Sequence, residues 1–177
     1  MLHLLTPDEI FPSLPEVDLE RLQRRGVRGL VLDLDNTLVA YGGREAAEPV
    51  LVWLREARAA GMRLCILSNG RPRRVRLTAE RLGLPWVESY TKPRRRGFRA
   101  AARLLGTRPH ETAVLGDQIF TDVLGGHRAG FVTVLVNPVS RRELPHTRVV
   151  RAIERLVFAL LLRRGRIDRE AWRLRTS

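Results

Sequence analysis

Several features are scarce in this chain, and each scarcity excludes a class of protein. Cys65 is the single cysteine among the 177 residues, so an intrachain disulfide is impossible and a reducing compartment is favoured. The longest apolar run, residues 156–162, is far shorter than the roughly 20 residues that span a bilayer. Residues 1–22 contain no basic segment followed by an apolar one, which a secretory signal requires. We therefore expect a cytoplasmic protein.

Acidic residues are also scarce relative to basic ones. The chain has 19 aspartates and glutamates against 32 lysines and arginines, so its formal net charge is +13. A surface of this charge attracts nucleic acid, anionic lipid headgroups or phosphorylated metabolites. A compositional preference for arginine on solvated faces is the alternative explanation of the charge, and the choice stays open. The arginines cluster in the segments 71–76, 94–99, 141–142 and 163–175.

Lysine is the rarest charged residue, since Lys92 is the only one in the chain. An ammonium is a compact point charge, whereas the guanidinium of arginine is a broad planar fork. A pocket that holds one cation between a phosphate and a carboxylate would favour the smaller group, and lysine is a frequent phosphate ligand. Either Lys92 serves such a pocket or it is a chance lysine in an arginine-biased chain.

Two aspartates follow the first strand-like apolar run. Residues 29–32 have the pattern of a buried parallel strand, and Asp33 and Asp35 come directly after it. Carboxylates this close repel one another unless a cation lies between them. Mg²⁺ takes oxygen ligands and is commonly held by one or two carboxylates, waters and a substrate phosphate. The segment 33–37 therefore indicates a metal and phosphate site, although Asp-Asn-Thr is also ordinary turn chemistry.

Two later apolar runs also end in polar residues. The run 64–67 is followed by Ser68 and Asn69, whose hydroxyl and backbone N–H groups could bind phosphate oxygens. Another short run precedes Asp117, which would be a third carboxylate at a strand end. Asp122 lies one turn further on, where it would either orient a neighbouring group or stabilise the start of a helix.

In order, these segments resemble the four motifs of the haloacid dehalogenase (HAD) superfamily. DLDNT at 33–37 is similar to motif I, Ser68 to motif II, Lys92 to motif III and GDQIFTD at 116–122 to motif IV. The longer segments DLDNTL, SNG, KP and GDQIFTDVLGG resemble more closely the YqeG-like phosphatases of HAD subfamily IIIA. That branch is related to mitochondrial phosphatidylglycerophosphate phosphatases.

The resemblance implies a role for each of these residues. Asp33 would be the nucleophile that forms an aspartyl-phosphate, and Asp35 the general acid and base. An aspartate at position 35 favours a phosphatase, because ATPases of this superfamily typically carry threonine there. Mg²⁺ would be held by Asp33, the main-chain carbonyl of Asp35 and Asp117, while Asp122 would orient Lys92 or a metal-bound water. The phosphate ligands would be Asn36, Thr37, Ser68, Asn69 and Lys92.

Apolar runs and helical patterns alternate along the chain. Strands separated by helices pair in parallel, which predicts an α/β, Rossmann-like three-layer sandwich of about five parallel strands. All four motifs would lie at the carboxyl ends of strands, where such sheets bind ligands. We expect strands near 29–33, 63–67, 86–89, 112–116 and 131–136, and helices near 46–60, 72–82, 94–105, 120–129 and 148–163.

The whole chain, 1–177, is expected to form one HAD-like hydrolase domain. Residues 1–26 would be a helical lead-in, 27–136 the catalytic core, and 148–177 a C-terminal helix with a basic tail. The intervals between the first three motifs each leave room for one helix and one strand, so we expect no cap domain and an open site. The C-terminal helix would dock on the sheet, a membrane or another chain through one stripe. That stripe comprises Ile153, Leu156, Val157, Leu160 and Leu161.

Two classes of function remain open. The leading hypothesis is a Mg²⁺-dependent phosphomonoester hydrolase that acts on phosphatidylglycerophosphate, on a terminal phosphate of nucleic acid, or on a small sugar phosphate. An anionic lipid or another bulky phosphomonoester is the preferred substrate, with a peripheral membrane contact. The alternative is a basic HAD scaffold that binds RNA or the ribosome with weak catalysis. The complete motifs favour the enzyme, whereas the net charge keeps the scaffold open.

Overall fold

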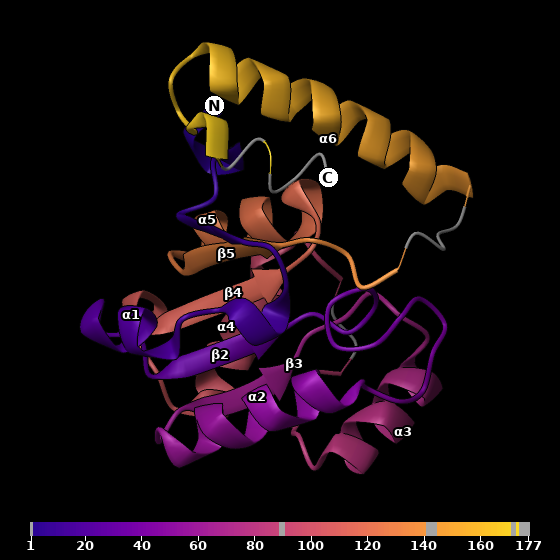
Figure 1. Cartoon of the computed structure of the whole chain (residues 1–177). Coiled ribbons are helices and arrows are strands. Elements are labelled where there is room, and N and C mark those ends of the chain that lie inside the picture. Colours follow the sequence, from indigo (N-terminus) through magenta and orange to yellow (C-terminus); the bar gives the residue numbers. More distant parts are fainter. Residues whose placement is uncertain (1, 89–90, 141–144, 171–172, 174–177) are drawn as a thin grey trace.

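A five-stranded parallel sheet forms the centre of the molecule (Figure 1). The computed structural model describes residues 2–88, 91–140, 145–170 and 173, with 145–149 described as backbone alone. The strand order is β1-β5-β4-β2-β3, and every neighbouring pair is parallel. The predicted α/β class is therefore confirmed. The strands are β1 (Glu9–Phe11), β2 (Gly29–Leu32), β3 (Arg63–Ile66), β4 (Thr112–Gly116) and β5 (Val132–Val136).

Helices cover both faces of this sheet. Successive strand residues point to opposite faces, so Leu30 packs with Trp53 and Val75 on one side, and Val31 packs with Phe98 on the other. The resulting three layers confirm the predicted sandwich. The helices are α1 (Leu19–Arg24), α2 (Glu48–Ala59), α3 (Pro72–Leu82), α4 (Arg95–Leu105), α5 (Leu124–Ala129) and α6 (Pro145–Arg163), with short helical turns η1 (Leu2–Leu5), η2 (Leu14–Glu16), η3 (Pro109–Glu111) and η4 (Ile119–Val123).

The expectation of a wholly helical lead-in at 1–26 was wrong. This segment contains β1, which pairs with β5 in the register Glu9 to Val134. The carboxylate of Asp8 supports the pairing by accepting hydrogen bonds from the backbone N–H and the hydroxyl of Thr133, both at 2.8 Å. A three-residue strand has too short a pattern to be recognised, and its partner lies more than a hundred residues away along the chain.

The strand expected near 86–89 is reduced to a single bridge. Trp86 forms an isolated parallel bridge with Ile66, and the backbone N–H of Val87 donates to the carbonyl of Ile66 at 2.8 Å. Residues 89–90 lie outside the described part of the chain. The fifth strand of the sheet is therefore β1 rather than this segment.

The intervals between the first three motifs contain few regular elements. Residues 33–47 form an irregular loop before α2, and the described residues between Ser68 and Lys92 contain α3 and the bridge at Trp86. Neither interval, in its described part, contains the additional strands and helices that a cap domain would need. The motif spacing predicts that the protein has no cap domain, and the elements in the described parts of these two intervals agree with that prediction.

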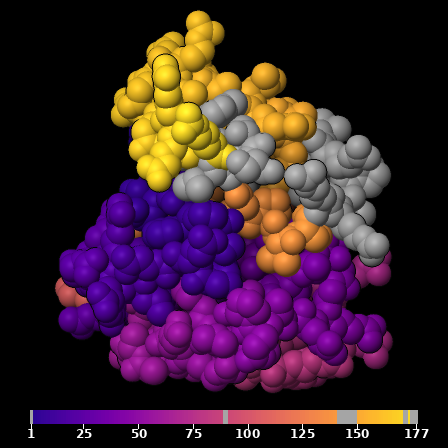
Figure 2. Space-filling view, viewed as in Figure 1, coloured from indigo at the N-terminus to yellow at the C-terminus, as the bar shows by residue number. Residues whose placement is uncertain are grey.

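Helix α6 packs on the part of the molecule formed by η4, β5 and the N-terminal segment. Phe158 and Leu161 are buried together with Ile119 and Leu135. Figure 2 shows the C-terminal segment as a ridge at one end of the molecule, beside the N-terminal residues in indigo. None of the helices in the described ranges combines the length and the apolar character of a membrane span.

The predicted apolar stripe of α6 is divided between two environments. Val157 and Leu161 point to the core, as expected. The other three residues of the stripe are exposed, with exposed fractions of 47% for Ile153, 71% for Leu156 and 38% for Leu160. The helix is rotated because Phe158 and a buried glutamate, Glu154, also occupy its inner face.

Candidate active site

The carboxyl ends of three adjacent strands bring the predicted motifs together. Asp33 follows β2, Ser68 follows β3 and Asp117 follows β4. The backbone N–H of Asp33 continues the ladder by donating to the carbonyl of Leu115 at 2.9 Å. Since parallel strands end at the same edge of the sheet, the three motifs meet in one place, as their order in the sequence predicts.

Lys92 lies between two buried aspartates from different motifs. Its Nζ donates to the carboxylates of Asp33 and Asp122, at 2.6 Å in the case of Asp122. The Lys92 side chain is only 3% exposed. Burial opposes its positive charge, but the carboxylates of Asp122 and Asp33 outweigh that effect and raise the pKa of the ammonium above its ordinary value. The only lysine of the chain is thus a fully charged ion-pair partner at the centre of the site.

The position of Asp122 depends on a glycine. A Cβ atom at Gly116 would lie 2.2 Å from the Asp122 Cγ, which is closer than any real contact. The second carboxylate oxygen of Asp122 accepts a hydrogen bond from the backbone N–H of Gln118 at 3.2 Å. Asp122 therefore contacts both Lys92 and the backbone at the start of its own helical turn. Its role in the site stays a prediction.

Three buried carboxylates converge beside Lys92. Ligand atoms of Asp33, Asp117 and Asp122 all lie within 4.8 Å of one another. Burial raises the pKa of Asp33 from its ordinary value of 3.8 to about 7; Lys92 opposes this shift, and the charges of Asp122 and Asp117 add to it. Carboxylate oxygens are the ligands that hard divalent cations prefer, and a cation would relieve this repulsion. The donor set therefore fits a divalent metal.

Asp35 is not among the three carboxylates that converge beside Lys92. Its carboxylate forms an ion pair with the guanidinium of Arg74 on α3 and accepts a hydrogen bond from the backbone N–H of Gly42 at 3.3 Å. Arg74 also donates to the carbonyl of Gly43 at 3.1 Å, so it connects Asp35 to the loop that follows motif I. Arg74 was not among the predicted site residues, because nothing in the cluster 71–76 distinguishes one arginine from another.

Thr37 and Ser68 lie at the site and make local hydrogen bonds. The Thr37 hydroxyl, fully buried, donates to the second carboxylate oxygen of Asp33 at 3.4 Å. The Ser68 hydroxyl accepts from the backbone N–H of Gly70 at 3.1 Å. The contacts of both hydroxyls with a phosphate stay predictions.

The side-chain amides of the two asparagines that were predicted to bind phosphate form hydrogen bonds with neighbouring loops. Asn69 accepts from the backbone N–H of Lys92 at 2.7 Å and donates to the Lys92 carbonyl at 3.1 Å. Asn36, with a φ of 62°, accepts from the Tyr41 N–H and the Ser140 hydroxyl, both at 3.1 Å. The side chain of Asn69 thereby positions motif III, a role that the sequence analysis did not foresee. Phosphate binding by either residue stays a prediction.

Helix α6 contributes two charged residues that the sequence analysis also missed. Arg151 pairs with the carboxylate of Asp117 and donates to its carbonyl. Glu154 is 2% exposed, accepts from the backbone N–H of Ile119 at 2.6 Å and pairs with Arg151 at 3.2 Å. These contacts attach α6 to the start of motif IV. An arginine and a glutamate three residues apart are common on helix surfaces, so no local pattern reveals such a contact.

Replacing Glu154 by alanine is expected to destabilise the fold. The change removes an acceptor from the buried N–H of Ile119, and an unsatisfied buried donor costs about 1–3 kcal/mol. Thermal unfolding should show a lower melting temperature than for Glu56→Ala, which alters an exposed glutamate on α2. Equal melting temperatures for the two variants would contradict the role of Glu154.

Comparisons with known proteins agree with this geometry. A family model for haloacid dehalogenase-like hydrolases matches residues 44–130. The probable phosphatase YqeG of Bacillus subtilis is 38% identical over 164 residues, which cover 93% of this chain and 95% of that protein. Phosphatidylglycerophosphate phosphatase 1 of Arabidopsis thaliana, chloroplastic/mitochondrial, is 30% identical over 156 residues, which cover 83% of this chain but only 44% of that protein.

A solved structure shares the fold. A HAD subfamily IIIA hydrolase from Legionella pneumophila superposes with a TM-score of 0.52 at 20% identity, over 70% of this chain and 71% of that one. At this level of identity the likeness concerns the fold alone. The extent of the match to YqeG is what shows the family. The chain therefore belongs to the haloacid dehalogenase-like hydrolases, in the YqeG-like phosphatase family, and is a phosphoric monoester hydrolase.

Proposed function

We propose that this enzyme hydrolyses phosphomonoesters through an aspartyl-phosphate formed on Asp33. The observation that carries the proposal is the contact of one buried ammonium, Lys92, with Asp33 and Asp122 beside Asp117. A carboxylate nucleophile divides a difficult displacement into two easier steps. The surrounding charges would stabilise the phosphoryl oxygens as the bonds to phosphorus change.

In the proposed first step, an Asp33 oxygen attacks phosphorus and the bond to the alcohol oxygen breaks. Asp35 donates a proton to that leaving oxygen. In the second step, water attacks the phosphorus of the aspartyl-phosphate, Asp35 takes the proton from the water, and inorganic phosphate leaves. The ion pair with Arg74 orients the Asp35 carboxylate but favours its ionised form, so this pair would have to open before Asp35 donates a proton. Lys92, Thr37 and Ser68 are the proposed ligands of the phosphoryl oxygens.

We propose Mg²⁺ as the metal, held by Asp33, the main-chain carbonyl of Asp35 and Asp117. When bound, it would shield the repulsion between the carboxylates and the substrate phosphate. Asp122 would stay on Lys92, where it already lies. Because Arg151 also pairs with Asp117, this arginine and the metal would share that carboxylate.

Metal binding should weaken below neutral pH. A carboxylate binds a metal only when it is ionised, and Asp33 titrates at a pKa of about 7. Asp33 would be ionised in about nine tenths of the metal-free molecules at pH 8 but in about one tenth at pH 6. Calorimetric titration with Mg²⁺ should therefore give an affinity about tenfold lower at pH 6. Equal affinities at the two pH values would contradict the shifted pKa.

The proposed substrate is a bulky anionic phosphomonoester, with phosphatidylglycerophosphate as the first candidate. The named activity of the Arabidopsis relative supports this choice. The exposed arginines Arg94, Arg95 and Arg96, next to Lys92, add positive charge there. A cleft of about 330 Å³ adjoins the Ser68 loop and offers apolar walls for the part of the substrate beyond the phosphate. Its lining comprises Ser68, Asn69, Gly70, Pro72, Val75, Trp86, Val87, Glu88 and Thr91.

Two turnover measurements test the proposed function. Hydrolysis of an aryl phosphate should require Mg²⁺ and stop in excess EDTA, and persistence in EDTA would exclude the mechanism. Values of kcat/KM should then be highest for phosphatidylglycerophosphate vesicles in a panel with sugar phosphates and with 3′- or 5′-phosphorylated oligonucleotides. A kcat/KM that is tenfold higher for a sugar phosphate than for the lipid would refute the lipid proposal. The highest kcat/KM for an oligonucleotide would assign the enzyme to nucleic-acid processing.

The net charge of +13 supports a second candidate, a basic scaffold that binds RNA or the ribosome. Of the arginine clusters, 71–76 and 94–99 lie wholly within the described residues, whereas 141–142 lies outside them. Tight RNA binding without turnover on any member of the panel would favour this candidate. We also propose that residues 1–177 act as one domain, in the cytoplasm and in peripheral contact with a membrane.

A further inference from the structure

The outer face of α6 carries an exposed apolar row. Ile153, Leu156 and Leu160 are spaced by three and four residues, so their side chains lie on the same side of the helix. Leu156, at 71%, has the largest exposed fraction among the large apolar residues that the structure describes. The opposite side of the helix is already used, since Phe158 and Leu161 are buried against the core. The row is therefore a surface feature rather than a displaced part of the core.

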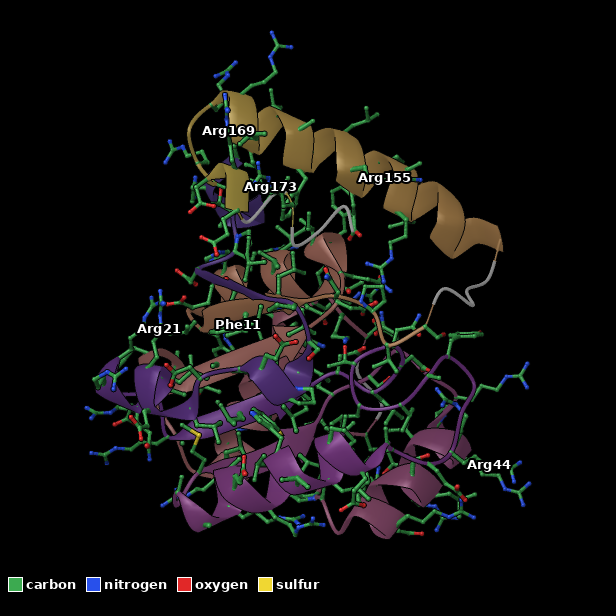
Figure 3. The ribbon with its side chains drawn as sticks, in the orientation of Figure 1. Phe11, Arg21, Arg44, Arg155, Arg169 and Arg173 are labelled. Carbon is green, nitrogen blue, oxygen red and sulfur yellow. The ribbon has the colours of Figure 1, made fainter. Side chains whose placement is uncertain are left out.

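The charges around this row are positive. Arg155 and Arg163 are exposed on α6, and Arg164 and Arg166 follow in the exposed segment after it (Figure 3 labels Arg155). The acidic residue of this helix, Glu154, is buried and bound to the backbone of η4. The outer face of α6 thus combines aliphatic side chains with cations; two exposed acidic residues, Asp168 and Glu170, lie after the helix in the segment that contains Arg166.

This combination favours a lipid bilayer over the other possible occupants. An amphipathic helix lies in the headgroup region with its aliphatic side chains immersed and its cations on anionic lipids. Proteins bind nucleic acid through contacts with phosphates and through aromatic side chains that stack on bases. A row of isoleucine and leucine contributes to neither interaction. In a symmetric dimer formed through the same face, the arginines of one copy would lie near the arginines of the other copy, and these like charges would repel one another.

We propose that the outer face of α6 docks on an anionic bilayer. The docking face comprises Ile153, Leu156, Leu160 and Arg163, with the exposed Arg155 and Arg164 at its margins. The inference rests on the proposed lipid substrate and adds the surface through which the enzyme reaches it.

The inner face of the same helix connects this docking face to the site. Arg151 pairs with Asp117, and Glu154 binds the N–H groups of Ile119 and Phe120. A helix with its side chains is about 10 Å wide, so a bilayer on the outer face would lie roughly one helix width from Asp117. Asp117 and the proposed bilayer would thus lie on opposite sides of α6, and a lipid phosphate would reach the uncapped site past the edge of this helix.

Co-sedimentation of the full chain with vesicles tests the docking face. Wild-type protein should bind phosphatidylglycerol/phosphatidylcholine vesicles at least about tenfold more tightly than pure phosphatidylcholine, because each arginine near an anionic surface strengthens binding roughly fivefold. The variant I153Q/L156Q should lose at least about tenfold in affinity for the anionic vesicles. The matched control is Leu104→Gln, which alters a 49% exposed leucine on α4 and should bind as wild type.

Charge variants separate the two components of the face. Arg155→Gln and Arg163→Gln should each weaken vesicle binding roughly fivefold and reduce its dependence on salt, whereas Arg103→Gln, exposed on α4, should not. Melting temperatures confirm that every variant is folded. Vesicle binding is measured without turnover, so a wild type that hydrolyses no phosphate but binds anionic vesicles through α6 would refute the proposed function and leave the docking face standing.

Four results would overturn the docking face. The first is equal binding of wild type to both vesicle compositions, or binding to neither. The second is undiminished binding by I153Q/L156Q. The third is RNA binding that I153Q/L156Q loses while vesicle binding is retained. The fourth is a wild-type dimer that becomes monomeric in I153Q/L156Q, which would assign the face to a second copy of the chain.

Discussion

Replacing Asp33 by asparagine is expected to abolish turnover, with kcat on an aryl phosphate lower by about a thousandfold or more. The amide has nearly the same size as the carboxylate but is not a nucleophile toward phosphorus. The asparagine side chain would occupy the same space beside Lys92 and Thr37 as the Asp33 carboxylate. Substrate binding should therefore change far less than kcat. Steady-state kinetics in saturating Mg²⁺ provide the measurement.

The fold of Asp33→Asn should be intact, because the change removes one of three mutually repelling carboxylates. A melting temperature at or above that of wild type, with an unchanged circular dichroism spectrum, would show that lost turnover is chemical. Glu56→Gln, on the exposed side of α2, serves as the matched control and should retain full activity. A variant at position 33 that keeps more than a few per cent of wild-type kcat would rule out Asp33 as the nucleophile.

Replacing Lys92 by arginine is expected to lower kcat/KM by about a hundredfold or more, even though the charge is conserved. The Lys92 side chain is 3% exposed, and its ammonium already contacts Asp33 and Asp122. A guanidinium is larger, planar and directed as a fork, so in this enclosed space it would displace one carboxylate or the other. An oxyanion-stabilising group that is lost or misplaced typically costs this much in rate.

The matched control for this substitution is Arg94→Lys, an exchange between the same two residue types at an exposed position two residues away. It should leave kcat/KM within about twofold of wild type, as surface substitutions usually do. Comparison with Lys92→Gln separates the shape of the cation from its charge. Near wild-type kcat/KM in Lys92→Arg would mean that the single lysine is an accident of composition.

The local sequence around each motif was sufficient to predict that these residues meet at one edge of the sheet. A short apolar run followed by a polar residue is a signal carried by neighbouring residues, so Asp33, Ser68 and Asp117 could be placed at strand ends without coordinates. The same alternation of strands and helices determined a parallel, three-layer fold. Lys92 could be singled out by its rarity, which is a property of composition alone.

Tertiary structure decided the features that depend on distant partners. Strand β1 is short and pairs with β5, Arg74 binds Asp35, and α6 turns three of its five stripe residues to the surface. Each of these depends on contacts between segments far apart in the chain, and hydrophobic periodicity cannot report such contacts.

The arginines illustrate the limit most clearly. The sequence determined that this protein is strongly basic, but Arg74, Arg151 and the exposed Arg155 look alike in an arginine-rich chain. One binds Asp35, one binds Asp117 and one faces outward from α6. Only packing separates them, because the role of a long charged side chain is decided by the group that its guanidinium meets and by whether water still reaches it.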